Sequence, residues 1–82
     1  MDTKGILDLI VSCTREVIPE LTNHVFQPSD SLQDLGANSV DRAEIVTMVL
    51  ESLALKIPRV EVFGPSNIGE LADLLHDKMA RP

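Results

Sequence analysis

The sequence is poor in aromatic and basic residues. Among 82 residues there are two Phe and no Trp or Tyr, and 7 Lys and Arg stand against 13 Asp and Glu, which gives a net charge of −6. Phosphate backbones are bound by clusters of Lys and Arg, so this balance argues against a nucleic-acid partner. The acidity suits either solubility alone or partners with basic docking surfaces.

Cysteine is also scarce, and long apolar runs are missing. Cys13 is the single cysteine, so no internal disulfide can form. Its spacing from Ile6, Ile10 and Val17 places it on an apolar helical stripe, where we expect a buried thiol rather than a reactive one. No segment is long enough to cross a membrane and no secretory signal pattern is present, so we expect a cytoplasmic protein without membrane contact.

What the sequence does contain is 44% hydrophobic residues, mostly aliphatic and at helical spacing. This pattern predicts a single all-α domain over residues 1–82, a small bundle of three main helices and one short helix with a long first loop. The main helices are expected at 3–17, from 39 to 53 or 55, and from 66 onward, with the short one near 60–63. Thr3 and Asn67 are the expected N-caps of the first and last helices, and Glu70 is expected to complete a capping box with Asn67.

The stretch from Ile18 to Asn38 forms the long loop in this prediction. A structureless loop of about twenty residues is uncommon unless it is packed or functional. We expect a helical turn over 31–35 that ends at Gly36 in the left-handed conformation. The apolar residues expected to pin the loop to the core are Leu21, Val25, Phe26, Leu32 and Leu35.

The helix expected from Ser39 has two apolar sides rather than one. At 3.6 residues per turn, one side collects Ile45, Val46, Val49 and Leu53. The roughly opposite side is flanked by Glu44 and Glu51 and collects Val40, Ala43, Thr47, Leu50 and Ala54. Either the helix lies deep among its neighbours, or the second side is a docking face for a partner.

Residues for catalysis or metal binding are not grouped along the chain. His24 and His76 lie in separate segments, and neither has a Cys or carboxylate at the spacing of a zinc site. Gly36 and Gly64 are isolated, so no phosphate-binding glycine loop is present. The chain also offers little material for a substrate pocket of the usual size. We therefore expect neither a metal site nor an enzyme.

Ser39 is the residue that stands out. As a structural residue, it or the preceding Asn38 can cap the helix. The same position also projects a hydroxyl into solvent, beside unpaired backbone N–H groups and the positive end of the helix dipole. Such an environment tolerates a phosphate ester well. Local physics alone does not separate the two interpretations.

The run DSLQDLGANSVD, residues 30–41, resembles the D-S-L-x-x-L-G-x-D-S-L/V signature of acyl carrier proteins. The resemblance continues at Ile57-Pro58 and at NIGEL, residues 67–71, and covers about residues 6–79. It implies that Ser39 carries 4′-phosphopantetheine through a phosphodiester. The thiol of that arm would then hold the acyl group, and Cys13 would have no part in the chemistry.

One position departs from the family pattern, because Asn38 stands where most carriers have Asp. Asn also caps helices, so the departure bears on metal-assisted transfer of the arm or on partner choice and not on the fold. The stretches GANSVDR, residues 36–42, and IPRVEVFG, residues 57–64, are most similar to the free-standing donor carriers of β-branching cassettes in modular polyketide pathways. Those carriers hold acetyl, sometimes propionyl, as a thioester and offer it to an HMG-synthase-like enzyme.

The resemblance also implies a set of partners for a monomeric carrier. These are a phosphopantetheinyl transferase, the HMG-synthase-like enzyme, an acyl-loading or decarboxylating ketosynthase-like enzyme, and an acyltransferase. Asn38 and Arg42 are expected to discriminate among partners. The docking residues that it implies are Asn38, Val40, Arg42, Ala43, Glu44, Thr47, Leu50 and Glu51. With an acetyl cargo we expect an exposed arm, because little apolar area is available to drive its burial.

Two other interpretations remain open. A carrier for fatty-acid, ordinary polyketide or aminoacyl cargo would bear the same arm, and only the net acidity and the surroundings of Asn38 argue against it. A helical adaptor without a prosthetic group would lose only helix stability in a Ser39→Ala variant, by roughly 0.5–2 kcal/mol. In the carrier interpretation that substitution abolishes modification and function while the fold stays nearly unchanged.

Overall fold

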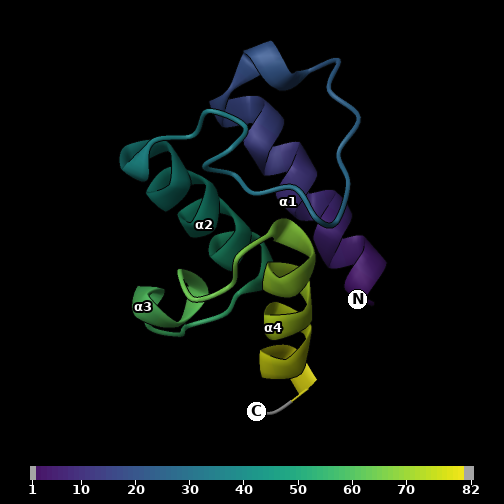
Figure 1. The fold of residues 1–82 in the computed structure, drawn as a ribbon. Coiled ribbons are helices and arrows are strands. Elements are labelled where there is room, and N and C mark those ends of the chain that lie inside the picture. The colour runs from purple at the N-terminus through teal and green to yellow at the C-terminus, as the bar shows by residue number, and fades with distance from the viewer. Residues whose placement is uncertain (1, 81–82) are drawn as a thin grey trace.

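The computed structural model describes residues 2–80 and contains only helices and loops in that range (Figure 1). The elements are α1 (Thr3–Val17), a 3-10 turn η1 (Pro19–Leu21), α2 (Ser39–Leu53), α3 (Arg59–Val62) and α4 (Ile68–Ala80). The predicted all-α fold of three main helices and one short helix is confirmed. The turn η1 was not predicted; it begins at Pro19, whose fixed φ suits the first position of a helix.

The N-terminus of α1 differs from the prediction by one residue. Asp2 is the N-cap, because its carboxylate accepts a hydrogen bond from the backbone N–H of Gly5 at 2.7 Å, and Thr3 is already helical. The predicted Thr3 cap is therefore wrong. A carboxylate at this position both accepts the capping hydrogen bond and interacts favourably with the positive end of the helix dipole.

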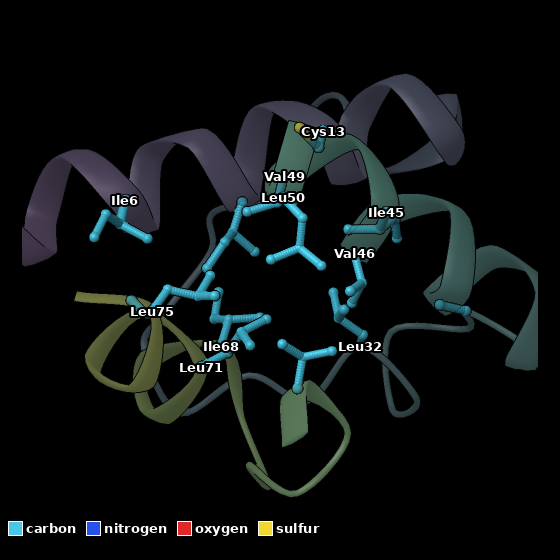
Figure 2. Close-up of a cluster of buried hydrophobic side chains, with 14 of the residues drawn as sticks. Ile6, Cys13, Leu32, Ile45, Val46, Val49, Leu50, Ile68, Leu71 and Leu75 are labelled. Atoms are coloured by element: carbon cyan, nitrogen blue, oxygen red, sulfur yellow. The ribbon is translucent and has the colours of Figure 1, made fainter. Parts of the chain in front are cut away.

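The core lies between the three main helices, with α1 packed against both α2 and α4 (Figure 1). Aliphatic side chains from all three helices and from the long loop point toward one another in this space (Figure 2). Cys13 is among them and only 4% exposed, as predicted. Burial, and to a lesser extent the Glu16 carboxylate, raises the pKa of the Cys13 thiol. The thiol is therefore a core group.

The long loop is anchored to the core at some of the expected residues and not at others. Leu32 is buried, and Leu21 and Phe26 pack partly against the core. Val25, however, is 75% exposed, so its predicted anchoring is wrong. The backbone around it is not helical, and successive side chains of an extended segment point to opposite sides, so Phe26 faces inward and Val25 outward.

The predicted turn over 31–35 is present. The backbone N–H of Leu35 donates to the Ser31 carbonyl at 3.0 Å, and that of Ala37 donates to the Leu32 carbonyl at 3.0 Å. Gly36 ends the turn at a φ of +99°, in the left-handed region that glycine adopts without strain.

The same loop is fastened to the start of α4 by two backbone hydrogen bonds. The N–H of Ile68 donates to the Asp30 carbonyl at 2.9 Å, and the N–H of Gly69 donates to the Pro28 carbonyl at 2.8 Å. These are N–H groups of the first helical turn, which have no partner within the helix. A Cβ on Gly69 would lie 2.8 Å from the Pro28 carbonyl oxygen, so only glycine permits this approach.

The side chain of Asp30 orders the loop locally. Its Oδ2 accepts a hydrogen bond from the Gln27 N–H at 2.9 Å and lies 3.0 Å from the His24 Nε2. The Gln27 bond first and then the His24 bond lower the pKa of the Asp30 carboxyl group. The ring of His24 also makes an edge contact with the ring of Phe26. The backbone carbonyl of His24 accepts a hydrogen bond from the Arg15 guanidinium at 3.1 Å. The contacts of His24 therefore hold the loop together.

The other helix ends follow the prediction with small changes. α2 ends at Leu53, and its C-cap Ala54 takes a left-handed φ of +54°. At the start of α4, the Asn67 Oδ1 accepts the backbone N–H of Glu70 at 2.7 Å, as predicted. The Glu70 carboxylate accepts its hydrogen bond from the Asn67 side-chain amide at 3.0 Å, whereas a capping box would use the backbone N–H of the cap residue.

Candidate functional site

Ser39 is the first residue of α2, and the capping of this helix is done by its neighbour. The Asn38 Oδ1 accepts the backbone N–H of Asp41 at 2.8 Å, and the Asp41 carboxylate accepts the backbone N–H of Asn38 at 3.4 Å. The Ser39 side chain is exposed, and within residues 2–80 its hydroxyl takes part in no hydrogen bond. The structure thus gives capping to Asn38 and leaves the Ser39 hydroxyl free for chemistry.

The backbone on the N-terminal side of Ser39 is held in place by buried contacts. Ala37 is only 2% exposed, and its N–H is bonded to the Leu32 carbonyl. Its carbonyl accepts a hydrogen bond from the Arg42 Nη1 at 2.8 Å, from one turn along α2. Ser39 therefore sits between a fixed loop and a capped helix, which fixes the backbone from which its side chain projects.

A groove of about 630 Å³ opens beside Ser39. We call it the Ser39 groove. Residues 31–33 of the long loop form one wall, residues 62–67 form the other, and Val46 and Leu71 contribute to its floor. Ser39 and Arg42 both line it. A chain attached to the Ser39 hydroxyl can therefore lie along the protein surface in this groove.

Among the described residues, the space between α2, α3 and α4 is much smaller. One apolar interstice between α2, α3 and α4 is too small to admit a water molecule. It is lined by Val46, Val49, Leu50, Val62, Leu71 and Leu75. In this conformation the chain has no room among these residues for an acyl group.

The residues around Ser39 fit a phosphodiester-linked prosthetic group. The Ser39 side chain is exposed at the N-terminus of α2, where the first backbone N–H groups have no partner within the helix, and Arg42 lines the same groove. Each of these favours a negatively charged ester at Ser39. Among residues 2–80, no three His, Cys, Asp or Glu side chains come together as ligands for a metal ion. No helix in this range is both long and apolar enough to span a membrane.

The predicted docking residues of α2 lie mostly on its outer side. Asn38, Glu44 and Glu51 are exposed, and Val40 is 71% exposed. Three more residues of this set are half-buried: Arg42, Ala43 and Thr47. In Thr47 the hydroxyl donates to the Ala43 carbonyl at 2.8 Å, so its methyl group is the part left for contact.

Leu50 does not belong to this set of outer residues. It is only 9% exposed and faces Val62 and Leu75 across the interstice described above, in the core. Its assignment to a docking face is therefore wrong. Leu50 follows Val46 by four residues, so the two lie on the same side of α2 and line the same interstice, and grouping Leu50 with the outer side misread the helical spacing.

Two exposed apolar residues near the groove were not among the predicted site residues. Val60, in α3, is 76% exposed, and Phe63, which follows α3 and lines the groove, is 48% exposed. The sequence held a signal for them. A helix of four residues can turn only one side to the core, and Val62 occupies it, so the neighbouring apolar residues must face solvent.

Comparisons with known proteins relate this chain to carrier proteins. Residues 8–75 match the family model described as "Phosphopantetheine attachment site". The chain is 57% identical over 79 residues to "Polyketide biosynthesis acyl-carrier-protein AcpK" of Bacillus subtilis (strain 168), covering 96% of each chain. It is 25% identical over 81 residues to an "Acyl carrier protein" of Saccharopolyspora erythraea, covering 99% of this chain and 85% of the relative.

A solved structure is similar in both fold and sequence. It is described as "Crystal Structure of the Curacin Biosynthetic Pathway HMG Synthase in Complex with Acetyl Donor-ACP", and one of its chains superposes with a TM-score of 0.90 at 51% identity. The match covers 94% of this chain and 99% of that one. Together with the family match over most of the sequence, these similarities show that the chain belongs to the acyl carrier proteins, which carry a covalently attached 4′-phosphopantetheine.

Proposed function

We propose that Ser39 bears the 4′-phosphopantetheine arm and that this carrier delivers an acetyl group to an HMG-synthase-like enzyme during polyketide β-branching. The observation that carries the proposal is the 51% identity, over nearly the whole chain, to a chain of a structure that pairs an HMG synthase with an acetyl donor carrier. The 57% identity to a polyketide carrier of Bacillus subtilis supports the same class of pathway.

The free hydroxyl of Ser39 supports it as the attachment point. A phosphopantetheinyl transferase would direct this hydroxyl, with loss of its proton, to the pantetheine-side phosphorus of the coenzyme A pyrophosphate, which breaks the pyrophosphate bond and releases adenosine 3′,5′-bisphosphate. Capping by Asn38 means that no helix-stabilising hydrogen bond is lost when Ser39 reacts. When attached, the group supplies a terminal thiol that holds an acyl group as a thioester. The chain itself contributes the position of that arm and the surface by which partners recognise it.

The proposed docking face consists of residues on and just before α2: Asn38, Val40, Arg42, Ala43, Glu44, Thr47 and Glu51. Its exposed valine and its carboxylates suit a partner surface that is partly apolar with a basic rim. Charged rims of this kind contribute association rate and selectivity more than affinity. Weak, fast docking is what a carrier that visits several enzymes needs. Neutral Asn38 beside cationic Arg42 is the pair proposed to discriminate among partners.

The acetylated arm is proposed to lie on the surface, in the Ser39 groove. An acetyl group offers too little apolar area to open the interstice between α2, α3 and α4. The other proposed partners are an acyl-loading or decarboxylating ketosynthase-like enzyme and an acyltransferase, which would place the acetyl group on the arm. A cytoplasmic monomer, with residues 1–82 as one domain, fits this cycle.

The first test is modification by a phosphopantetheinyl transferase and coenzyme A, followed by intact mass measurement and peptide mapping. We expect a single phosphopantetheine on Ser39. A Ser39→Ala variant should stay unmodified with its helical circular dichroism intact, whereas Ser52→Ala, at another exposed serine of α2, should be modified normally. No modification with several transferases would leave the helical-adaptor interpretation, whereas modification at another residue would refute the assignment to Ser39.

The second test is transfer of the acetyl group. The acetylated carrier is mixed with an HMG synthase and an acceptor β-ketoacyl carrier, and loss of the acetyl group is followed by mass. Val40→Asp and Glu44→Lys should slow transfer, whereas Glu16→Lys, an equal charge change on exposed α1, should not. Transfer of the acetyl group to a fatty-acid ketosynthase, with no transfer to the HMG synthase, would indicate a carrier for a different cargo.

A further inference from the structure

We propose that Arg42 binds the phosphodiester on Ser39 and thereby directs the arm into the Ser39 groove. The inference rests on the proposed attachment at Ser39. It makes Arg42 a positioning residue of the carrier itself, in addition to any contact it makes with a partner enzyme.

The first argument is the placement of the guanidinium. Arg42 follows Ser39 by three residues, so the two side chains are neighbours on one side of α2. Side chains of an α-helix lean toward its N-terminus, which directs Arg42 back toward Ser39. The hydrogen bond from the Arg42 Nη1 to the Ala37 carbonyl, at 2.8 Å, fixes the guanidinium beside the residues that lead into Ser39. Both residues line the same groove.

The Arg42 guanidinium has N–H donors left for a further partner. A guanidinium carries five N–H donors, and the Ala37 carbonyl accepts from one nitrogen only. Within residues 2–80 no carboxylate pairs with Arg42. The nearby Asp41 carboxylate accepts the Asn38 N–H, and Asn38 itself is neutral. In a chain of net charge −6, an unpaired arginine at this place is available for an anion.

A phosphodiester on Ser39 suits both the Arg42 guanidinium and the Ser39 groove. A phosphodiester keeps one negative charge at neutral pH, and arginine binds phosphate oxygens through charge-assisted hydrogen bonds. Holding the phosphate at Arg42 places the start of the arm between the two walls of the groove. The wall formed by 62–67 offers the ring of Phe63 and the side chain of Ser66 to the dimethyl carbon and the amides of the arm.

The experiment compares apo and holo forms of the chain by two-dimensional ¹H–¹⁵N NMR and ³¹P NMR, in the parent sequence and in Arg42→Gln, Arg42→Lys and Arg59→Gln. In the parent protein, attachment of the arm should shift the amide signals of 63, 66 and 67 as well as those next to Ser39. Arg42→Gln should lose the shifts at 63–67 and move the ³¹P signal. Arg42→Lys should keep part of both effects, because a cation remains.

Arg59→Gln removes an equal charge from α3, away from the groove lining, and should leave the parent pattern unchanged. High salt should weaken the distant shifts in the parent protein and leave Arg42→Gln unaffected. If holo Arg42→Gln keeps the parent shifts at 63–67 and the parent ³¹P signal, Arg42 does not hold the phosphate and the inference is overturned. Failure to form any holo protein at Ser39 would instead overturn the proposed function, so the two failures are distinguishable.

Discussion

The close approach of α4 to the long loop predicts that Gly69→Ala destabilises the fold. The new Cβ would lie 2.8 Å from the Pro28 carbonyl oxygen and 2.9 Å from the Pro28 Cβ. Neither atom belongs to a flexible side chain that could rotate away, so the backbone of the loop must retreat. That movement weakens the hydrogen bond from the Gly69 N–H to the Pro28 carbonyl, and with it the neighbouring bond between Ile68 and Asp30.

The size of the effect follows from three contributions. Overpacking of this kind costs about 1–3 kcal/mol. Each weakened backbone hydrogen bond forfeits up to about 0.5–1.5 kcal/mol. Replacing glycine by alanine inside a helix returns about 0.5–1 kcal/mol. The two weakened bonds together lose up to about 1–3 kcal/mol, more than the helix gains, so we expect the free energy of unfolding to fall by roughly 1–5 kcal/mol.

Urea denaturation followed by far-ultraviolet circular dichroism measures this loss. Gly64→Ala is the matched control, since its Cβ would meet only the Glu61 carbonyl at 3.5 Å, an ordinary contact. It should change the free energy of unfolding by less than about 0.5 kcal/mol. A Gly69→Ala variant as stable as the parent would refute the argument, and so would an equal loss in Gly64→Ala.

Three further predictions concern individual residues. Positions 54 and 36 both have a left-handed φ, which glycine adopts without strain. Ala54→Gly should therefore raise the free energy of unfolding by about 0.5–1 kcal/mol, and Gly36→Ala should lower it by about 1–2 kcal/mol. Urea midpoints that move in the same direction in the two variants would contradict this. The lowered pKa of Asp30 contributes stability that is present above its ordinary value of 3.8 and is lost as the pH falls through the folded-state pKa. Acid titration of Asp30→Asn should therefore show a shallower loss of stability in that range, and an unchanged curve would count against the role of the carboxylate. Burial and the raised pKa of the Cys13 thiol should make its reaction with a disulfide reagent much slower in the native protein than in urea, and equal rates would place the thiol outside the core.

The helices could be predicted because their signal is local. Apolar residues at helical spacing, Pro19 after the first helix and the pairing of Asn67 with Glu70 each act within a few residues. The position of Ser39 at the start of α2 belongs to the same class of information. Local reasoning erred at helix starts. It was wrong by one residue at the first cap, where both Asp2 and Thr3 are suitable, and at α4 it expected a start at 66 and a full capping box, whereas the helix begins at Ile68 and Glu70 bonds the Asn67 side chain.

The contacts between distant segments could not be predicted in this way. The exposure of Val25 depends on the path that the long loop takes over the core. The need for glycine at 69 arises from Pro28, far away in the sequence. The hydrogen bond from Arg42 to Ala37 likewise requires the loop to have packed first. Each of these depends on tertiary structure that periodicity does not contain.

The two hydrogen bonds that join α4 to residues 28 and 30 have a mechanical consequence for the Ser39 groove. They immobilise the base of the wall formed by 31–33, because that wall continues directly from Asp30. The opposite wall follows α3, a single helical turn between Pro58 and Gly64. The same hydrogen bonds hold Ile68, directly after the opposite wall, so the α3 end of that wall is the part farthest along the chain from them. A partner enzyme that presses on Val60 or Phe63 would widen or narrow the space beside Ser39 without touching the serine.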